Sequence, residues 1–256
     1  KATDQRPALV FFHGGSWTGG EPSQLAPQST YLASRGMVCI SAQYRLLSSG
    51  VSSGSELPAC CEQDAKSAFR WVRAHAAELG IDPARLGVGG GSAGGYLAAC
   101  VALVPGSDDA ADDLKVQLKP AALVLFNPVI GGRPAEVADA TFERRFGPKQ
   151  AEFLAHSPAN HVTGDAPPTV IFHGAADTVI PPVQIRRFAE SMTAVGARCE
   201  VHFYEGMGHG FFNRGKSQNC FSETVITADR FLASLGWLQG EPVPANLPVF
   251  GPRKIP

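Results

Sequence analysis

Residues 85–98 read RLGVGGGSAGGYLA, an apolar strand followed by a glycine-rich turn around one serine and then by a helix. The turn contains the pattern Gly-x-Ser-x-Gly, formed by Gly90, Ser92 and Gly94. A serine on so sharp a turn adopts a strained backbone, and side chains on the flanking residues would collide with neighbouring main chain. The pattern alone is weak evidence in a chain with 28 glycines. The strand before it and the helix after it favour a nucleophilic serine over a purely structural turn.

A second glycine-containing turn lies near the start of the chain. The apolar run 8–12 has the pattern of a strand buried on both faces, and it leads directly into His13-Gly14-Gly15. Two glycines at this point let main-chain N–H groups approach a reacting carbonyl oxygen, while the histidine braces the loop. An ordinary strand-to-loop turn is the alternative. Its pairing with the serine turn favours an oxyanion hole.

An acid and a histidine follow two later strands. Asp177 comes just after the apolar run 169–174, and His209 comes just after the strand pattern 198–204. Sites in open α/β sheets gather at the carboxyl ends of strands, so both side chains are expected at one edge of the sheet. Asp177 could instead cap the turn that follows it. Asp165, a nearby acid, lies on the wrong side of its strand.

His209 differs from the other histidines because it has a glycine on each side, on a loop at a strand end. The remaining candidates lie on a charged helix face, in a polar insertion, or in and beside strands, where structural histidines are common: His75, His156, His161, His173 and His202. No His, Cys and carboxylate cluster has metal-ligand spacing, so no metal is expected.

Strands and helices alternate along the whole chain, which predicts an α/β protein whose mostly parallel sheet is covered by helices on both faces. A chain of 256 residues with this pattern is expected to form one domain, 1–256, with an insertion at 131–166. The predicted strands are 8–12, 37–42, 85–89, 121–126, 168–173 and 198–204, and the predicted helices are 59–79, 93–104, 181–195 and 222–235, with further helices in the insertion.

Composition excludes several classes of partner. The formal net charge is −1 and there is no basic run, so neither nucleic acid nor an anionic membrane surface is indicated. No apolar stretch reaches the ~18 residues of a membrane span. Six cysteines do not make a disulfide scaffold. Cys39, Cys100 and Cys199 are expected as buried thiols, and one disulfide could form among Cys60, Cys61 and Cys220.

Several stretches together resemble the α/β-hydrolase esterases of the hormone-sensitive-lipase-like type, closest to the branch with feruloyl and acetyl-xylan esterases and other carbohydrate acetylesterases. They are HGGSW, SAQYRL, RWVR, GIDPARLGVGGGSAGG, FNPV, HGAADTVIP and YEGMGHGFFN, which occur in family order over nearly the whole chain. The resemblance implies that Ser92 is the nucleophile, His209 the general base and acid, and Asp177 the residue that orients it. It also implies oxyanion donors at Gly14, Gly15 and Ala93, and no cofactor.

Two departures from this family pattern stand out. Esterases of this type usually carry one or two more strands before the His-Gly-Gly strand, whereas only residues 1–6 precede it here and the chain does not begin with Met. We therefore expect a processed, truncated or incomplete chain. The family also often has a large helical lid, and residues 47–57 and 131–166 offer little sequence for one. The tail 241–256 contains five prolines and is expected to lie extended over the surface.

The sequence gives less information about the substrate than about the catalytic residues. Short loops argue against a lipase, and the charged side chains of the insertion suit a polar alcohol group: Arg133, Glu136, Asp139, Glu143, Arg144 and Arg145. Candidate substrate-binding residues are Ser16, Trp17, Tyr44, Tyr96, Asn127 and Phe211, of which Trp17, Tyr44 and Tyr96 could offer flat faces to a sugar ring or simply pack inside the core.

We expect a short acyl group, most simply acetyl, on a small-molecule, oligosaccharide or polysaccharide ester, with a feruloyl ester or a general short-chain ester as the alternative. A serine exopeptidase of the same fold is less favoured because no second domain is evident, and an inactive binding protein because all three triad residues are present. An acyltransferase remains an alternative if the site excludes water. A polysaccharide substrate would imply a secreted or periplasmic protein, with the cytoplasm as the alternative. The sequence assigns no oligomeric state.

Overall fold

A computed structural model describes residues 3–47, 57–131 and 146–248 of the chain. Six strands form one sheet in the order β2-β1-β3-β4-β5-β6, and every neighbouring pair is parallel. Their bounds are β1 Arg6–Phe12, β2 Val38–Ala42, β3 Ile81–Gly91, β4 Leu123–Phe126, β5 Thr169–Gly174 and β6 Cys199–Tyr204. The predicted α/β class and parallel sheet are confirmed.

The inner strands β1, β4 and β5 are largely apolar and buried because both faces of the sheet are covered. Successive residues of β1 alternate between two cores: Ala8, Val10 and Phe12 belong to one hydrophobic cluster, and Leu9 and Phe11 belong to the other. This alternation follows from the pleat of a strand, which directs neighbouring side chains to opposite faces. The edge strands β2 and β6 are only partly buried.

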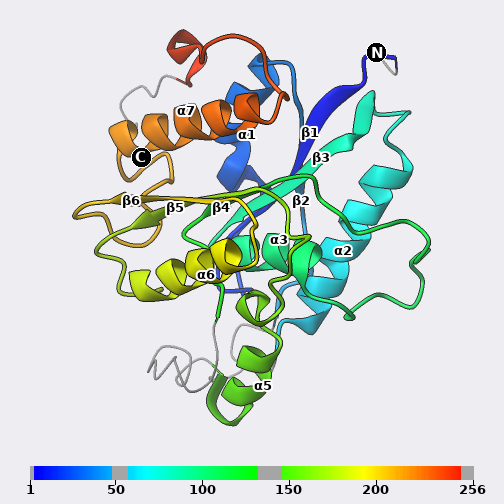
Figure 1. Ribbon diagram of the computed structural model, residues 1–256, viewed down its shortest axis with the longest axis vertical. Coiled ribbons are helices and arrows are strands. Elements are labelled where there is room, and N and C mark those ends of the chain that lie inside the picture. Colours follow the sequence, from blue (N-terminus) through cyan, green and yellow to red (C-terminus); the bar gives the residue numbers. More distant parts are fainter. Residues whose placement is uncertain (1–2, 48–56, 132–145, 249–256) are drawn as a thin grey trace, which may run out of the picture.

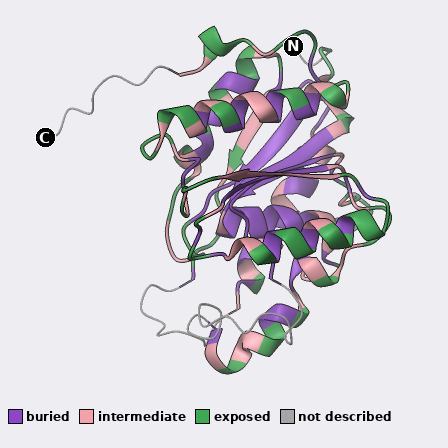
Figure 2. Ribbon diagram, turned by 60° about the vertical axis from the view of Figure 1, so that its left-hand side comes forward, coloured by how far each residue is buried: buried purple, intermediate pink, exposed green. Residues whose placement is uncertain are grey.

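Helices α2 (Ala59–Ala74), α3 (Ala93–Leu103) and α6 (Pro182–Ala194) cover one face of the sheet, and α1 (Ala26–Ser34) and α7 (Gln218–Ser234) cover the other (Figure 1). Figure 2 shows the buried strands as the middle layer, with the exposed residues on the outer sides of the helices. The insertion contributes the short helix α5 (Gln150–Ala155) and the 3-10 turns η2 (Gly147–Lys149) and η3 (Pro158–Asn160).

The largest differences from the predicted boundaries are in α2, α7 and β3. Helix α2 ends at Ala74, five residues early, and turns lead from it to Gly80, which has a positive φ of 67°. Helix α7 begins four residues early, because the Ser217 side chain accepts the N–H of Cys220 and so caps the helix there. Strand β3 is longer than predicted at both ends.

Helix α1 and the 3-10 turn before it, η1 (Pro22–Leu25), were not predicted. Helix α1 buries only Gln28, Tyr31 and Leu32, too few apolar residues to produce a recognisable helical period. The packing of this segment against the sheet and α7 therefore decides its structure. This is the usual way in which tertiary contacts override weak local preference.

All six cysteines are free thiols. The Sγ atoms of Cys60 and Cys61 lie 4.0 Å apart, and Cys220 packs with the hydrophobic cluster on the opposite face of the sheet. The disulfide that the sequence allowed is thus not formed. Cys100 is fully buried as predicted, whereas Cys39 and Cys199, on the edge strands, are only partly buried. Desolvation raises the pKa of Cys39 and of Cys199 to about 12.

A buried carboxylate ties α1, α7 and the C-terminal segment together. Asp229 is fully buried and accepts hydrogen bonds from the Tyr31 hydroxyl and from Arg35 Nε, each at 2.7 Å. The Tyr31 oxygen in turn accepts the backbone N–H of Val243 at 3.1 Å. The described part of the tail also contains the 3-10 turn η4 (Pro244–Asn246), so it is less extended than predicted.

Replacing Tyr31 by Phe should test this network. The substitution removes one of the two donors to a buried charge, so we expect the free energy of unfolding to fall by about 1–3 kcal/mol. Urea denaturation measures the change. The matched control is Tyr204→Phe at a half-buried position of β6, where a smaller loss is expected. Equal losses in the two variants would contradict the role given to Asp229.

Candidate active site

Ser92 stands between the last residue of β3 and the first residue of α3. Its backbone has φ 54° and ψ −117°, a strained conformation for a residue with a side chain. A Cβ at Gly90 would lie 2.3 Å from the Gly94 carbonyl oxygen, and one at Gly94 would lie 2.1 Å from the Phe12 oxygen. The two flanking glycines are therefore required by close main-chain contacts, as the sequence predicts.

Ser92, His209 and Asp177 form one chain of hydrogen bonds. His209 Nε2 lies 2.9 Å from Ser92 Oγ, and His209 Nδ1 lies 2.8 Å from Asp177 Oδ2. Asp177 follows β5 and His209 follows β6, so neighbouring parallel strands bring them to the same edge of the sheet as Ser92. With its proton on Nδ1, the imidazole donates a hydrogen bond to the carboxylate, which leaves Nε2 as the nitrogen that can accept the serine proton.

Asp177 is buried and fully bonded. Its Oδ1 accepts the backbone N–H groups of Val179 and Ile180 at 2.8 and 2.9 Å. Burial by itself would raise the pKa of this carboxyl, but the hydrogen bonds from His209, Ile180 and Val179 outweigh burial and lower the pKa. Asp177 thus caps the following turn and hydrogen-bonds His209 at the same time, so the two readings of the sequence do not exclude each other.

Asn127 does not lie where a substrate-binding residue is expected. It follows β4 with a positive φ of 42°, its side chain is buried, and its Nδ2 donates to Asp177 Oδ2 at 3.1 Å. The prediction of a substrate contact is therefore wrong, because the side chain is fully buried and its amide nitrogen is bonded to Asp177. The structure instead gives Asp177 Oδ2 a second donor beside His209.

Gly14 does not offer the free donor that was expected of it. Its N–H donates to the side-chain oxygen of Gln24, with 2.6 Å between Gly14 N and Gln24 Oε1. One N–H cannot serve this strong bond and an oxyanion equally well, so Gly14 is removed from the donor set. Its glycine identity has another reason, since a Cβ there would lie 2.8 Å from the Gly91 oxygen and 3.2 Å from Ser92 Cβ.

The carbonyl groups of the same loop are also engaged. The Tyr44 hydroxyl donates to the His13 oxygen at 2.8 Å, and His13 Nδ1 donates to the Gly14 oxygen at 2.9 Å. The Gly15 oxygen accepts two N–H groups of the next turn, at 3.1 and 3.0 Å. In a trans peptide the C=O and the next N–H point in opposite directions, so the Gly14 carbonyl fixes the direction of the Gly15 N–H.

Two amides meet the description of oxyanion donors. Gly15 N–H belongs to the loop fixed in this way, and Ala93 N–H is the first amide of α3, which no preceding helical turn can satisfy. Gly15 has φ 128°, and a Cβ there would lie 2.1 Å from the Gly19 oxygen, so only glycine fits. Ser16 is exposed on the same loop, beside these groups.

The aromatic residues proposed as sugar platforms are packed inside the protein. Trp17 is 3%, Tyr44 2% and Tyr96 0% exposed, so none presents a flat face to a ligand. Tyr44 stacks on the His13 ring, and burial raises its pKa. Trp17 meets Tyr96 edge-on. Phe211 is buried against Tyr204. These expectations were wrong, because a motif residue beside an active-site loop is often its support.

The Tyr96 hydroxyl contacts a buried carboxylate, Glu62, that the sequence analysis did not identify. Glu62 is 2% exposed and accepts the Tyr96 hydroxyl at 2.7 Å. His156, from the segment after α5, reaches the same carboxylate at 2.9 Å, and this hydrogen bond raises the pKa of His156. The insertion is thereby attached to α2 and α3. Because the partners lie 94 residues apart, no local pattern could have identified the pair.

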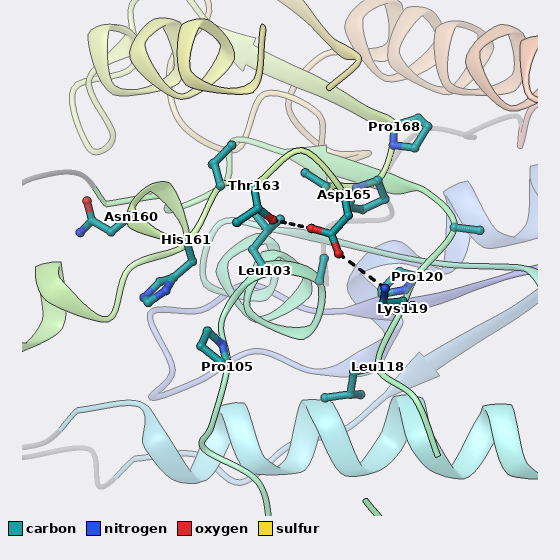
Figure 3. A pocket seen from close by; sticks show the side chains of 15 residues that line it. Leu103, Pro105, Leu118, Lys119, Pro120, Asn160, His161, Thr163, Asp165 and Pro168 are labelled. Carbon is teal, nitrogen blue, oxygen red and sulfur yellow. Dashed lines mark hydrogen bonds and ion pairs between the residues drawn. The ribbon is translucent and has the colours of Figure 1, made fainter. Parts of the chain in front are cut away.

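The six charged residues expected to favour a polar alcohol group, at positions 133, 136, 139 and 143–145, lie outside the described residues. A pocket of about 620 Å³ lies elsewhere, at the end of α3 and at the amino ends of β4 and β5 (Figure 3). Lys119 and Asp165 form an exposed ion pair of 3.5 Å on its wall. It therefore lies at the opposite edge of the sheet from Ser92 and does not belong to this site.

Within the described ranges, no three His, Cys, Asp or Glu side chains are grouped so that they could hold a metal ion. A search of the same ranges also finds no helix whose length and apolar character would let it cross a membrane.

Comparisons with known proteins agree with this geometry. Residues 1–192 match the BD-FAE family, and residues 147–239 match the dienelactone hydrolase family. Among curated proteins, the esterase LipC of Mycobacterium tuberculosis is 31% identical over 82% of this chain and 54% of its own length, and the probable carboxylic ester hydrolase LipM of the same species is 28% identical over 95% and 58%. The chain spans little more than half the length of these relatives.

Solved structures give a more complete match. The apo form of Thermogutta terrifontis esterase 2 is 43% identical, with a TM-score of 0.83, over 94% of this chain and 88% of that one. The same esterase with propionate bound is 42% identical with a TM-score of 0.83 over the same shares. The chain therefore belongs to the BD-FAE family, with the α/β-hydrolase fold and the architecture of a serine esterase.

Proposed function

We propose that this protein hydrolyses carboxylic esters with Ser92 as the nucleophile, His209 as the general base and acid, and Asp177 as the residue that orients the histidine. The observation that carries the proposal is the continuous relay from Ser92 Oγ through the imidazole to a buried carboxylate, at 2.9 and 2.8 Å. A serine hydroxyl becomes an effective nucleophile only when a neighbouring base removes its proton, and this geometry provides the base.

In the first step, Ser92 Oγ attacks the ester carbonyl carbon while His209 Nε2 takes the hydroxyl proton. The carbonyl electrons move to oxygen, and the N–H groups of Gly15 and Ala93 stabilise the negative charge. The intermediate then collapses, the bond to the alcohol oxygen breaks, and His209 returns the proton to the alcohol. Water repeats the sequence on the acyl-serine, releasing the acid and restoring Ser92. The proposed reaction needs no cofactor.

We infer a short acyl group, most simply acetyl, carried by a carbohydrate. The first part is supported by the Thermogutta relative, which has been solved with propionate bound. The second is supported by the charged character of the insertion sequence and by the resemblance to carbohydrate acetylesterases. The burial of Trp17, Tyr44 and Tyr96 removes one argument for a sugar, so the carbohydrate assignment has less support than the esterase assignment. A polymeric substrate would place the protein in a secreted or periplasmic location.

Ser92→Ala and His209→Ala should each lower kcat for p-nitrophenyl acetate by about 10⁴-fold or more, because the two groups act as one unit. The double variant should be little worse than either single one. His202→Ala, at a half-buried histidine of β6, is the matched control and should retain activity. Activity of His209→Ala within tenfold of the wild type would exclude the proposed base.

Asn127→Asp tests whether Asn127 acts through its hydrogen bond to Asp177 or only through packing. Aspartate is nearly isosteric and tolerates the positive φ of this position, but it replaces a donor to Asp177 Oδ2 with a second carboxylate. We expect kcat to fall about 10- to 100-fold with little change in KM, because the orientation of His209 matters most in the transition state. Steady-state kinetics at neutral pH would refute the role if kcat were unchanged.

A chain-length series of p-nitrophenyl esters, with acetylated xylan and feruloyl esters alongside, tests the substrate. We expect acetate to butyrate to react faster than octanoate, and acetate to be released from an acetylated polysaccharide. Faster cleavage of octanoate would exclude the short acyl pocket. If no acetylated sugar reacts, only the general esterase assignment survives. An aminoacyl-p-nitroanilide, tested with Ser92→Ala as the blank, distinguishes a serine exopeptidase.

A further inference from the structure

We propose that Gln24 is a positioning residue for the oxyanion hole, and that a neutral acceptor is required at this position. The proposal rests on the esterase function proposed for Ser92. Gln24 belongs to the turn η1, ten residues after Gly14, and lies outside every motif that the sequence displays. Its side chain reaches back to the loop beside the nucleophile and accepts the Gly14 N–H at 2.6 Å.

The hydrogen bond from Gly14 N–H to Gln24 holds the second end of the His13–Gly14 peptide. In the unit between His13 and Gly14, the carbonyl oxygen accepts the Tyr44 hydroxyl and the N–H donates to Gln24. The next unit has its carbonyl held by His13 Nδ1, and its N–H is the Gly15 donor. With both ends of the first plane held, rotation about the bonds of Gly14 is restricted. The Gly15 N–H is then held in one direction before substrate arrives, as transition-state stabilisation requires.

Gln24 itself lies on the turn η1, which is held by packed neighbours. Its own N–H donates to the Glu21 oxygen at 3.1 Å, and the next residue, Leu25, is 1% exposed in the core beneath α1. Helix α1 follows directly and is attached to α7 through Asp229. A group held by packed neighbours can keep a donor within the small tolerance that catalysis needs.

The chemical identity of the side chain also has a reason. A Cβ at Gly14 would lie 3.2 Å from Ser92 Cβ and 3.4 Å from Gln24 Oε1, so this oxygen lies close to the reacting centre. A glutamate could accept the same N–H, but its charge would repel the negative oxygen that develops in the transition state. A carboxamide accepts the bond without that charge.

Two variants test the two parts of the proposal on p-nitrophenyl acetate. Gln24→Met keeps the length of the side chain and removes the acceptor, so kcat should fall about 10- to 100-fold while KM changes little. Gln24→Glu keeps an acceptor and adds a charge. Its kcat relative to the wild type should rise as pH falls from about 8 to about 5, because the added carboxyl gains a proton and loses its charge.

Amide exchange of Gly14 gives a readout that does not depend on catalysis. The amide should be protected in the wild type and in Gln24→Glu, and exposed to exchange in Gln24→Met. Ser23→Ala, at an exposed residue of the same turn, is the matched control and should match the wild type in every measurement. Thermal unfolding of each variant shows whether any loss reflects the fold.

The outcomes separate the proposals. Gln24→Met with kcat within twofold of the wild type would overturn the positioning role, and a pH-independent ratio for Gln24→Glu would overturn the requirement for a neutral acceptor. If Gln24→Met does not fold, Gln24→Glu still tests the proposal, because it retains the hydrogen bond. A wild-type protein that hydrolysed none of the esters would refute the proposed function instead, and the exchange rate of Gly14 would still show whether Gln24 holds the loop.

Discussion

The site depends on one close contact between main chains. Gly94, in the first turn of α3, lies so near the end of β1 that a Cβ would be 2.1 Å from the Phe12 oxygen and 2.4 Å from the His13 oxygen. This contact sets the start of α3, and with it Ser92, directly against the loop that follows β1. Ser92 and the loop after β1 therefore come together because β1 and β3 are neighbours in the sheet and no side chain separates them.

Hydrogen bonds to the neighbouring polar groups then fix the orientation of each side chain and amide at the site. Asp177 accepts two backbone N–H groups on one oxygen and His209 with Asn127 on the other, which leaves the carboxylate one orientation. The loop after β1 follows the same principle, since Gln24 accepts the Gly14 N–H and His13 donates to the Gly14 oxygen. Buried polar groups must be bonded, so whatever stays unbonded at a site is available for chemistry.

The local patterns of the sequence predicted most of the fold but fewer of the supporting contacts. All six strands were predicted, and the inner ones show apolar runs because burial on both faces requires them. Helix α1 escaped prediction since it buries few apolar side chains. Trp17, Tyr44 and Tyr96 were assigned to the substrate because they stand beside motif residues, but proximity in sequence does not show which way a ring packs.

The sequence alone predicts the order of the strands and the positions that must be glycine, because strained turns and close main-chain contacts require glycine locally. Ser92, Asp177 and His209 could be selected because each follows a predicted strand. Only the tertiary structure decided which amide of the loop stays free, which oxygen of Asp177 meets Asn127, and that Gln24 holds Gly14. These choices depend on side chains that reach across the fold, and such contacts leave no periodic pattern in the chain.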